Sequence, residues 1–320
     1  MNKKRREIIE NNEVSEIKTY KLGGYDQKVL IDGKSRKNPV IIFLHGGPGS
    51  PIPFCEGCRG MFPEYTDKAV MVYWDQLGCG INNHIIDDSF SVTNFVDMAI
   101  DLIKNIKSEF PDNKLVLFGV SWGSFLAAEA AGKVPDLIDE VIVYGQILKN
   151  LFFNDDVYTE FENAKLSGSQ RKQFETIKSK NVHTGDDVAQ VAKFIRKYTE
   201  GYQSKTGEKV HLGKIIKGIL QSPDYTFKDF TAIVKNGYLK NNSIWKELIT
   251  VDLSNCLKNM SVPYYIIQGS KDIVTSTKTI ADFISKAGNK NLSIKIIENN
   301  AHIPSADGME AVYNHLFEKV

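Results

Sequence analysis

The segment Lys114–Ser124, with the sequence KLVLFGVSWGS, constrains the fold more strongly than any other part of the chain. A mostly apolar run leads into Gly-Val-Ser-Trp-Gly, and an alanine-rich segment follows. This succession predicts a buried strand, a tight turn and a buried helix. In such a turn the backbone of Ser121 is strained and its hydroxyl is exposed. Gly119 and Gly123 are expected beside it because a side chain at either position would collide with the neighbouring strand or helix.

The short G-x-S-x-G pattern is not decisive by itself, because a plain glycine–serine turn in another α/β protein would show it too. The surrounding sequence favours the strand–turn–helix interpretation. Continuous apolar runs at 40–44, 69–73 and 141–144, the last preceded by Glu140, are typical of strands covered on both faces, and residues 95–106 have the spacing of an amphipathic helix. This alternation predicts a mostly parallel, doubly wound sheet with helices on both sides.

The strand pattern stops after Gly145 and resumes at Pro263. Helical patterns and recurring aromatic residues fill the interval, and we expect most of these aromatics to pack against one another. The prediction is an α/β core domain of residues 1–146 and 257–320, interrupted by a helical cap of residues 147–256. The apolar face of the cap is expected to cover the carboxyl edge of the sheet.

Three residues with complementary chemistry each follow a predicted strand: Ser121, Asp272 and His302. A serine hydroxyl needs a base within hydrogen-bond reach and a carboxylate that orients the base before it can attack a carbonyl. The strands of a parallel sheet end at one edge, so the three loops are expected to converge there. The order Ser…Asp…His is the one found in the α/β-hydrolase fold. A turn aspartate and a surface histidine are the alternative interpretation.

Two backbone N–H groups are expected to bind the oxyanion that such an attack creates. The first belongs to Trp122, the residue after the nucleophile, at the positive end of a helix. The second is assigned to Gly47 in the turn His45–Gly49, because Pro48 has no N–H and the glycines let the backbone approach a substrate closely. The alternative for this segment is a simple tight turn.

Three motifs together resemble the proline iminopeptidase (prolyl aminopeptidase) group of α/β-hydrolases: His45-Gly-Gly-Pro-Gly49, Tyr73-Trp-Asp-Gln76 and Gly119-Val-Ser-Trp-Gly-Ser124. The resemblance covers the sheet domain, roughly residues 17–146 and 257–320. It implies the triad Ser121, Asp272 and His302. The implied activity is removal of an N-terminal residue, usually proline, from a small peptide or aminoacyl amide, with no metal or other cofactor.

Two features depart from that group. The group usually has arginine after Asp-Gln, where this chain has Leu77, and the cap carries no motif that matches. In the group, acidic cap residues hold the free amine of the substrate. Glu160, Glu162, Glu200 and Glu208 are available here, but nothing in the sequence selects among them, and a solvated helix face is the alternative for each.

The sequence therefore predicts a serine hydrolase that forms an acyl-enzyme, with an aminopeptidase of proline type as the first choice. Many relatives that carry these motifs hydrolyse other amides or esters, so a carboxylesterase or lactonase is the alternative enzyme. A ligand receptor that keeps the hydrolase fold is a further alternative. Epoxide hydrolases and dehalogenases of this fold use an aspartate nucleophile, and Ser121 argues against them.

Composition restricts the partners. The 320 residues are 42% apolar and 25% charged, as in ordinary soluble globular proteins, and their net charge of +1 gives no reason to expect nucleic acid or an anionic membrane. We found no apolar run long enough to span a bilayer. The basic start of the chain is followed by Glu7–Glu13 instead of the apolar core of an export signal, so we expect a cytoplasmic protein.

The four cysteines do not form a recognisable metal or redox motif. Cys55 and Cys58 make one C-x-x-C, but a structural zinc site needs a second close pair, and Cys79 and Cys256 are far apart. Free thiols in a reducing compartment are expected, with a redox or metal role as the alternative.

Overall fold

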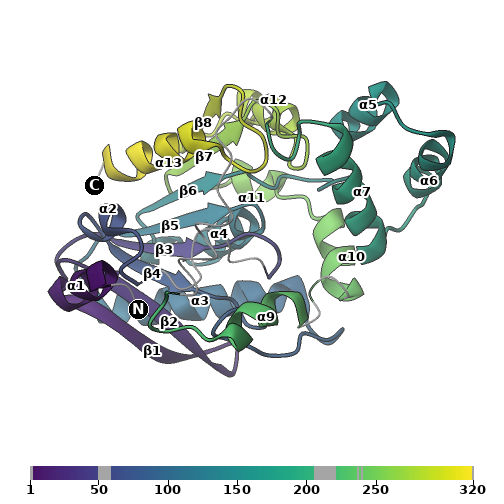
Figure 1. Ribbon diagram of the computed structural model, residues 1–320. Coiled ribbons are helices and arrows are strands. Elements are labelled where there is room, and N and C mark those ends of the chain that lie inside the picture. Colours follow the sequence, from purple (N-terminus) through teal and green to yellow (C-terminus); the bar gives the residue numbers. More distant parts are fainter. Residues whose placement is uncertain (1–2, 50–58, 205–220, 236–237, 239–240, 319–320) are drawn as a thin grey trace.

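The computed structural model describes residues 3–49, 59–204, 221–235, 238 and 241–318. One sheet of eight strands runs through the middle of this described part (Figure 1). Its strands are β1 (Val14–Leu22), β2 (Tyr25–Gly33), β3 (Val40–Leu44), β4 (Val70–Trp74), β5 (Leu115–Val120), β6 (Glu140–Tyr144), β7 (Tyr264–Gly269) and β8 (Leu292–Ile297). The spatial order is β1-β2-β4-β3-β5-β6-β7-β8.

The sheet is mostly parallel. Only the pairs β1–β2 and β2–β4 are antiparallel within this sheet, and β1 and β2 form a hairpin around Gly23-Gly24. Every residue of β3, β4, β5 and β6 is buried, which is why these strands appear in the sequence as continuous apolar runs and not as alternating patterns.

Helices cover both faces of the sheet, which confirms the predicted layers (Figure 1). The helices of the core are α1 (Lys3–Asn11), α2 (Pro63–Thr66), α3 (Val92–Glu109), α4 (Trp122–Lys133), the 3-10 turn η1 (Pro135–Leu137), α11 (Ser254–Lys258), α12 (Thr277–Ala287) and α13 (Ala306–Glu318). One face packs against α3, α4 and α12, through Phe95, Trp122 and Ile280. The opposite face packs against α2 and α13, through Tyr65 and Val312.

The strand order reverses between β3 and β5. The chain leaves β3 toward β4 on one side, while β5 lies on the other side of β3 and continues to β6. Loops that leave β3 and β5 therefore start next to each other and separate, which opens a crevice at the carboxyl ends of these strands. The turn His45–Gly49 and Ser121 both lie at this point, because they follow β3 and β5.

The predicted cap region contains helices and, in its described residues, no strand longer than the isolated bridge between Lys149 and Asp252. Its helices are α5 (Asp155–Asn163), α6 (Gly168–Lys178), α7 (Gly185–Tyr198), α9 (Phe227–Lys235) and α10 (Asn242–Thr250). In Figure 1, α5, α6, α7 and α10 are grouped at one end of the sheet, apart from α9. The exact boundaries of the cap stay a prediction.

Aromatic residues form a small core inside the cap. The Phe161 ring packs edge-on against Phe174 and Phe194, and Phe194 does the same with Tyr198. The expectation that most cap aromatics pack among themselves is confirmed for these four. None of the helices in the described part of the chain combines the length and apolar character that crossing a membrane requires.

Candidate active site

Ser121 sits in a strained turn between β5 and α4. Its φ of 53° and ψ of −115° fall outside the conformations that non-glycine residues normally adopt. Its N–H donates to the Tyr144 carbonyl at 2.9 Å, which fixes the turn to the neighbouring strand. A Cβ atom at Gly123 would lie 1.8 Å from the Leu44 carbonyl oxygen, and one at Gly119 would lie 2.5 Å from the Gly123 oxygen. The two glycines are therefore required, as the sequence predicts.

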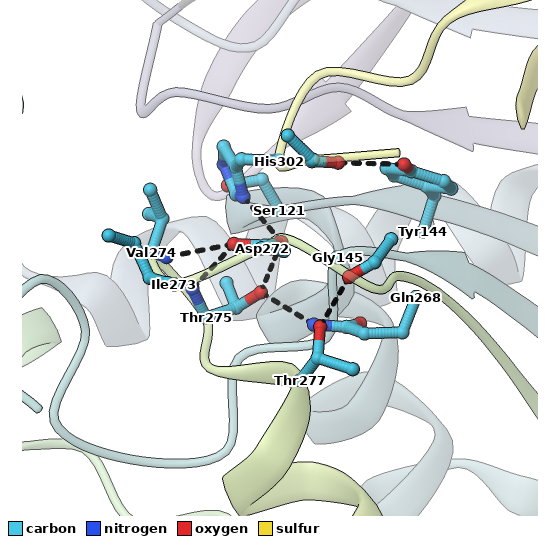
Figure 2. Close-up of polar contacts among 12 residues, drawn as sticks. Ser121, Tyr144, Gly145, Gln268, Asp272, Ile273, Val274, Thr275, Thr277 and His302 are labelled. Atoms are coloured by element: carbon cyan, nitrogen blue, oxygen red, sulfur yellow. Dashed lines mark hydrogen bonds and ion pairs between the residues drawn. The ribbon is translucent and has the colours of Figure 1, made fainter. Parts of the chain in front are cut away.

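The structure brings Ser121, His302 and Asp272 together from three separate loops (Figure 2). Ser121 Oγ lies 2.9 Å from His302 Nε2, and His302 Nδ1 lies 2.9 Å from Asp272 Oδ2. An ionised carboxylate only accepts hydrogen bonds, so Nδ1 carries the imidazole proton and Nε2 accepts from the serine hydroxyl. This arrangement can remove the proton from Ser121 as the hydroxyl attacks an electrophile.

Asp272 is held in place by four donors. Its Oδ1 accepts from the backbone N–H groups of Val274 at 2.8 Å and Thr275 at 3.1 Å. Its Oδ2 accepts from the Thr275 hydroxyl at 2.7 Å as well as from His302, and the Thr275 hydroxyl in turn accepts from Gln268 Nε2 at 2.9 Å (Figure 2). The side chain of Asp272 is fully buried, so these donors replace the water that an exposed carboxylate would bind.

The segment 298–305, here called the His302 loop, is fastened to the sheet by Tyr144. The Tyr144 hydroxyl donates to the Ala301 carbonyl at 2.8 Å. Burial raises the pKa of Tyr144 well above its usual value, so the hydroxyl keeps its proton and remains a donor. Gly145 directly follows β6 with a φ of 69°, a conformation that favours glycine, and a Cβ atom there would lie at ordinary contact distance, 3.5 Å, from His302 Cε1.

A segment that follows α7 also holds the His302 loop. The backbone N–H of His302 donates to the Gly201 carbonyl at 3.2 Å, and that of Ile303 donates to the Tyr202 carbonyl at 2.9 Å. The Tyr202 ring lies 5.8 Å from the imidazole, centre to centre. The region predicted as the cap thus contacts the imidazole directly, which the sequence did not indicate.

The turn after β3 lies directly against the serine. A Cβ atom at Gly46 would be 3.6 Å from Ser121 Cβ. Gly47 has a φ of 128°, a conformation that favours glycine, and it is partly exposed. Trp122 is the first residue of α4 and is buried. The two predicted oxyanion donors therefore belong to segments on either side of Ser121, and their role as donors stays a prediction.

A cavity of about 870 Å³ lies between α5, the end of α7 and the loop after β7, and Asp272 forms part of its wall. Two of the four acidic candidates, Glu160 and Glu200, line this cavity. Glu200 is already paired with Lys271, whose Nζ lies 2.6 Å from its carboxylate. Charged side chains of both signs thus line the cavity together with Asp272, whereas neither Ser121 nor His302 is among its lining residues.

The other two acidic candidates do not line this cavity. Glu162 pairs with Lys178 at 3.0 Å near the protein surface, and Glu208 lies outside the described residues. Leu77, which stands where the proline iminopeptidase group usually has arginine, is buried in the main apolar cluster. Its carbonyl accepts a hydrogen bond from the Tyr238 hydroxyl.

The cysteines give no sign of a metal centre in the described residues, where no group of three or more His, Cys, Asp or Glu side chains is placed to hold one. Cys79 and Cys256 are thiols outside any disulfide bond. Cys55 and Cys58 lie outside the described part of the chain.

Residues 39–308 match the protein family described as the alpha/beta hydrolase fold. The chain belongs to this family. Among curated proteins it is 22% identical to a "Probable aminopeptidase YbaC" of Bacillus subtilis over 305 residues, or 93% of each chain. It is 24% identical to a "Putative proline iminopeptidase" of Mycoplasma genitalium over 293 residues, or 89% of this chain and 91% of the relative.

The structure of a proline iminopeptidase from Mycobacterium smegmatis superimposes with a TM-score of 0.63 at 16% identity, covering 95% of this chain and 97% of the other. At that identity the match shows the shared fold only. Together with the two relatives, it confirms the resemblance that the three sequence motifs predict. The family places the chain among the hydrolases.

Proposed function

We propose that this protein is a serine hydrolase that forms an acyl-enzyme, and that its substrates are small peptides or aminoacyl amides with a free N-terminal residue of proline type. The observation that carries the serine mechanism is the unbroken series of hydrogen bonds from Ser121 through His302 to Asp272. The names of the two relatives, which span about nine tenths of the chain, support the aminopeptidase.

The reaction has two halves. The Ser121 oxygen attacks the carbonyl carbon of the scissile bond while its proton moves to His302 Nε2, and the carbonyl oxygen becomes an anion held by the N–H groups of Trp122 and Gly47. When the tetrahedral intermediate collapses, the C–N bond breaks and His302 returns the proton to the leaving amine. Water then attacks the acyl-enzyme with His302 again taking a proton, which releases the free amino acid and restores Ser121.

A carboxylesterase or lactonase is the second candidate, and the ion pairs of the acidic cap residues favour it. Glu200 is paired with Lys271 and Glu162 with Lys178, so two of the four acidic residues proposed for a substrate amine already have cationic partners. An ester substrate needs no carboxylate for an amine. The cytoplasmic location remains a prediction.

The test is a substrate panel on the wild type, Ser121→Ala and Ser285→Ala. Ser285 is an exposed serine on α12 and serves as the matched control. The panel contains prolyl and alanyl p-nitroanilides, their N-acetylated forms and short p-nitrophenyl esters. We expect turnover of the free aminoacyl amides, a loss of at least about 10³-fold in Ser121→Ala, and no change in Ser285→Ala.

Three other outcomes would correct the proposal. Turnover of esters alone would replace the aminopeptidase by the second candidate, and equal turnover of acetylated and free amides would reject an aminopeptidase that needs a free amine. Unchanged activity in Ser121→Ala would reject the serine mechanism. A wild type that turns over nothing in the panel and is not labelled by a fluorophosphonate would point instead to a receptor on the hydrolase fold.

A further inference from the structure

Gln76 connects the two segments that flank Ser121. It follows β4, and its side chain is fully buried. The indole Nε1–H of Trp122 donates to Gln76 Oε1 at 2.8 Å, and Gln76 Nε2 donates to the His45 carbonyl at 3.2 Å. One amide group therefore ties the start of α4 to the turn after β3, across the crevice where the strand order reverses.

The orientation of this amide follows from its partners. An indole N–H can only donate and a backbone carbonyl can only accept, so the oxygen of Gln76 must face Trp122 and its nitrogen must face His45. Exchanging the two ends would break both hydrogen bonds inside a buried site. Such a buried link, hydrogen-bonded at both ends, resists displacement more strongly than an exposed one.

The backbone of Gln76 adds a third bond to the same turn. Its N–H donates to His45 Nε2 at 3.0 Å, while His45 Nδ1 lies 2.8 Å from the Gly46 carbonyl. These partners require a neutral imidazole with the proton on Nδ1. Burial lowers the pKa of His45 to about 4, so the ring is neutral at physiological pH and the bonding pattern is stable there.

We propose that Gln76 is a positioning residue that sets the spacing of the two oxyanion donors, the backbone N–H groups of Trp122 and Gly47. This inference rests on the proposed serine hydrolase function and assigns a role to the Asp-Gln motif, which that function leaves unused. The Gln76 side chain is hydrogen-bonded to the indole of Trp122 in one donor segment. In the other segment it is hydrogen-bonded to the carbonyl of His45, two residues before Gly47. Neither contact involves substrate.

The physical reason is the steep distance dependence of oxyanion binding. Donors act when they lie about 2.7–3.1 Å from the oxygen that develops charge, and the loss of one donor costs about 10²- to 10³-fold in turnover. A displacement of about 1 Å costs up to about 10²-fold. Releasing the link between the two donor segments should therefore slow the chemical step without weakening the binding of substrate in its ground state.

The chain contains a matched control for this link. Gln27 is also fully buried, accepts from the indole Nε1–H of Trp74 at 2.9 Å, and donates to the Leu22 carbonyl at 3.1 Å. Gln27 thus makes the same two kinds of hydrogen bond as Gln76, one to an indole and one to a backbone carbonyl. Its bonds connect strands β1, β2 and β4 instead of the two segments that flank Ser121. Gln27→Met therefore removes an equivalent buried amide without touching the predicted oxyanion donors.

The experiment compares wild type, Gln76→Met and Gln27→Met. The measurements are kcat and KM on the best substrate of the panel, the melting temperature, and the affinity for phenylboronic acid, which forms a tetrahedral adduct with a reactive serine. We expect Gln76→Met to lower kcat by about 10- to 100-fold with KM within about twofold of wild type. The boronate affinity should fall by a similar factor, because the adduct uses the same donors.

Gln27→Met should lower the melting temperature by a similar amount and leave kcat and boronate affinity unchanged. The pH dependence of kcat/KM should be the same in all three proteins, because neither substitution touches His302 or Asp272. If Gln76→Met does not fold, Trp122→Phe supplies the test, because it removes the indole donor together with part of the buried ring and keeps the backbone N–H. It should show the same losses of kcat and boronate affinity.

Equal kcat in Gln76→Met and Gln27→Met, or an unchanged boronate affinity in Gln76→Met or Trp122→Phe, would overturn the positioning role. The serine mechanism would survive that result, because wild-type turnover and its loss in Ser121→Ala test the mechanism independently. A wild type with no turnover and no labelling of Ser121 would overturn both.

Discussion

Replacing Asp272 by asparagine should move the imidazole proton of His302 from Nδ1 to Nε2 while the side chains of the site keep their positions. Oδ1 of Asp272 accepts from two backbone N–H groups, those of Val274 and Thr275. An amide NH2 cannot accept these bonds, so the asparagine oxygen must stay at this position. The new NH2 group then replaces Oδ2, which lies 2.9 Å from His302 Nδ1.

The consequence follows from the imidazole. Because the asparagine NH2 donates, Nδ1 must accept, and the ring proton moves to Nε2. Nε2 lies 2.9 Å from Ser121 Oγ and can then no longer take the serine proton. We expect a loss of about 10⁴-fold in kcat, which corresponds to about 5 kcal/mol of transition-state stabilisation. This is the loss found when the same tautomer is imposed on a serine protease triad.

The assay is kcat on the best aminoacyl or ester substrate, with Asp282→Asn as the control, since Asp282 is exposed on α12. The melting temperature should fall only modestly in Asp272→Asn, because both backbone bonds to Oδ1 are kept and only the bond from the Thr275 hydroxyl to Oδ2 is lost. Fluorophosphonate labelling of Ser121 should slow together with turnover. Activity of Asp272→Asn within tenfold of wild type would refute the tautomer argument and the role of Asp272.

Two further substitutions test the surroundings of the site. Gly201→Ala would place a Cβ atom 2.3 Å from Ile273 Cγ1 and shift the carbonyl that accepts from the His302 N–H, so kcat should fall about tenfold. The double variant Gly201→Ala/Ile273→Ala should recover part of the lost kcat, because it removes the clash. Equal kcat in the single and double variants would contradict this. The pKa of His45 falls from 6.5 to about 4 on folding, so the unfolded chain gains the proton first as pH drops. The unfolding free energy should therefore decrease by about 3 kcal/mol between pH 6.5 and 4, measured as wild type minus His45→Gln in urea titrations; a pH-independent difference would show that His45 is not buried neutral.

Much of the sheet and the site was predictable because each depends on local sequence. The buried strands β3, β5 and β6 are short apolar runs, and the residues after them must lie at one edge. Ser121, Asp272 and His302 could thus be grouped without knowing any distance between them. The strain at Ser121 follows in the same way from the glycines on either side of it.

The contacts that the sequence did not reveal join residues far apart in the chain. Gln76 stands in a motif that the sequence singles out, yet its partner Trp122 is 46 positions away, and their meeting depends on how β4 and α4 pack. The contact of Gly201 with the His302 loop depends on the path of the chain after α7, where no strand pattern gives a register.

The reactivity of Ser121 itself tests the central claim most directly. The purified protein is treated with a fluorophosphonate at equimolar concentration, and the modified residue is located by mass spectrometry. We predict one label per chain, on Ser121, and a labelling rate that falls steeply in His302→Ala. No label, or a label on another residue at the same rate in His302→Ala, would contradict the proposal that Ser121 is activated by His302.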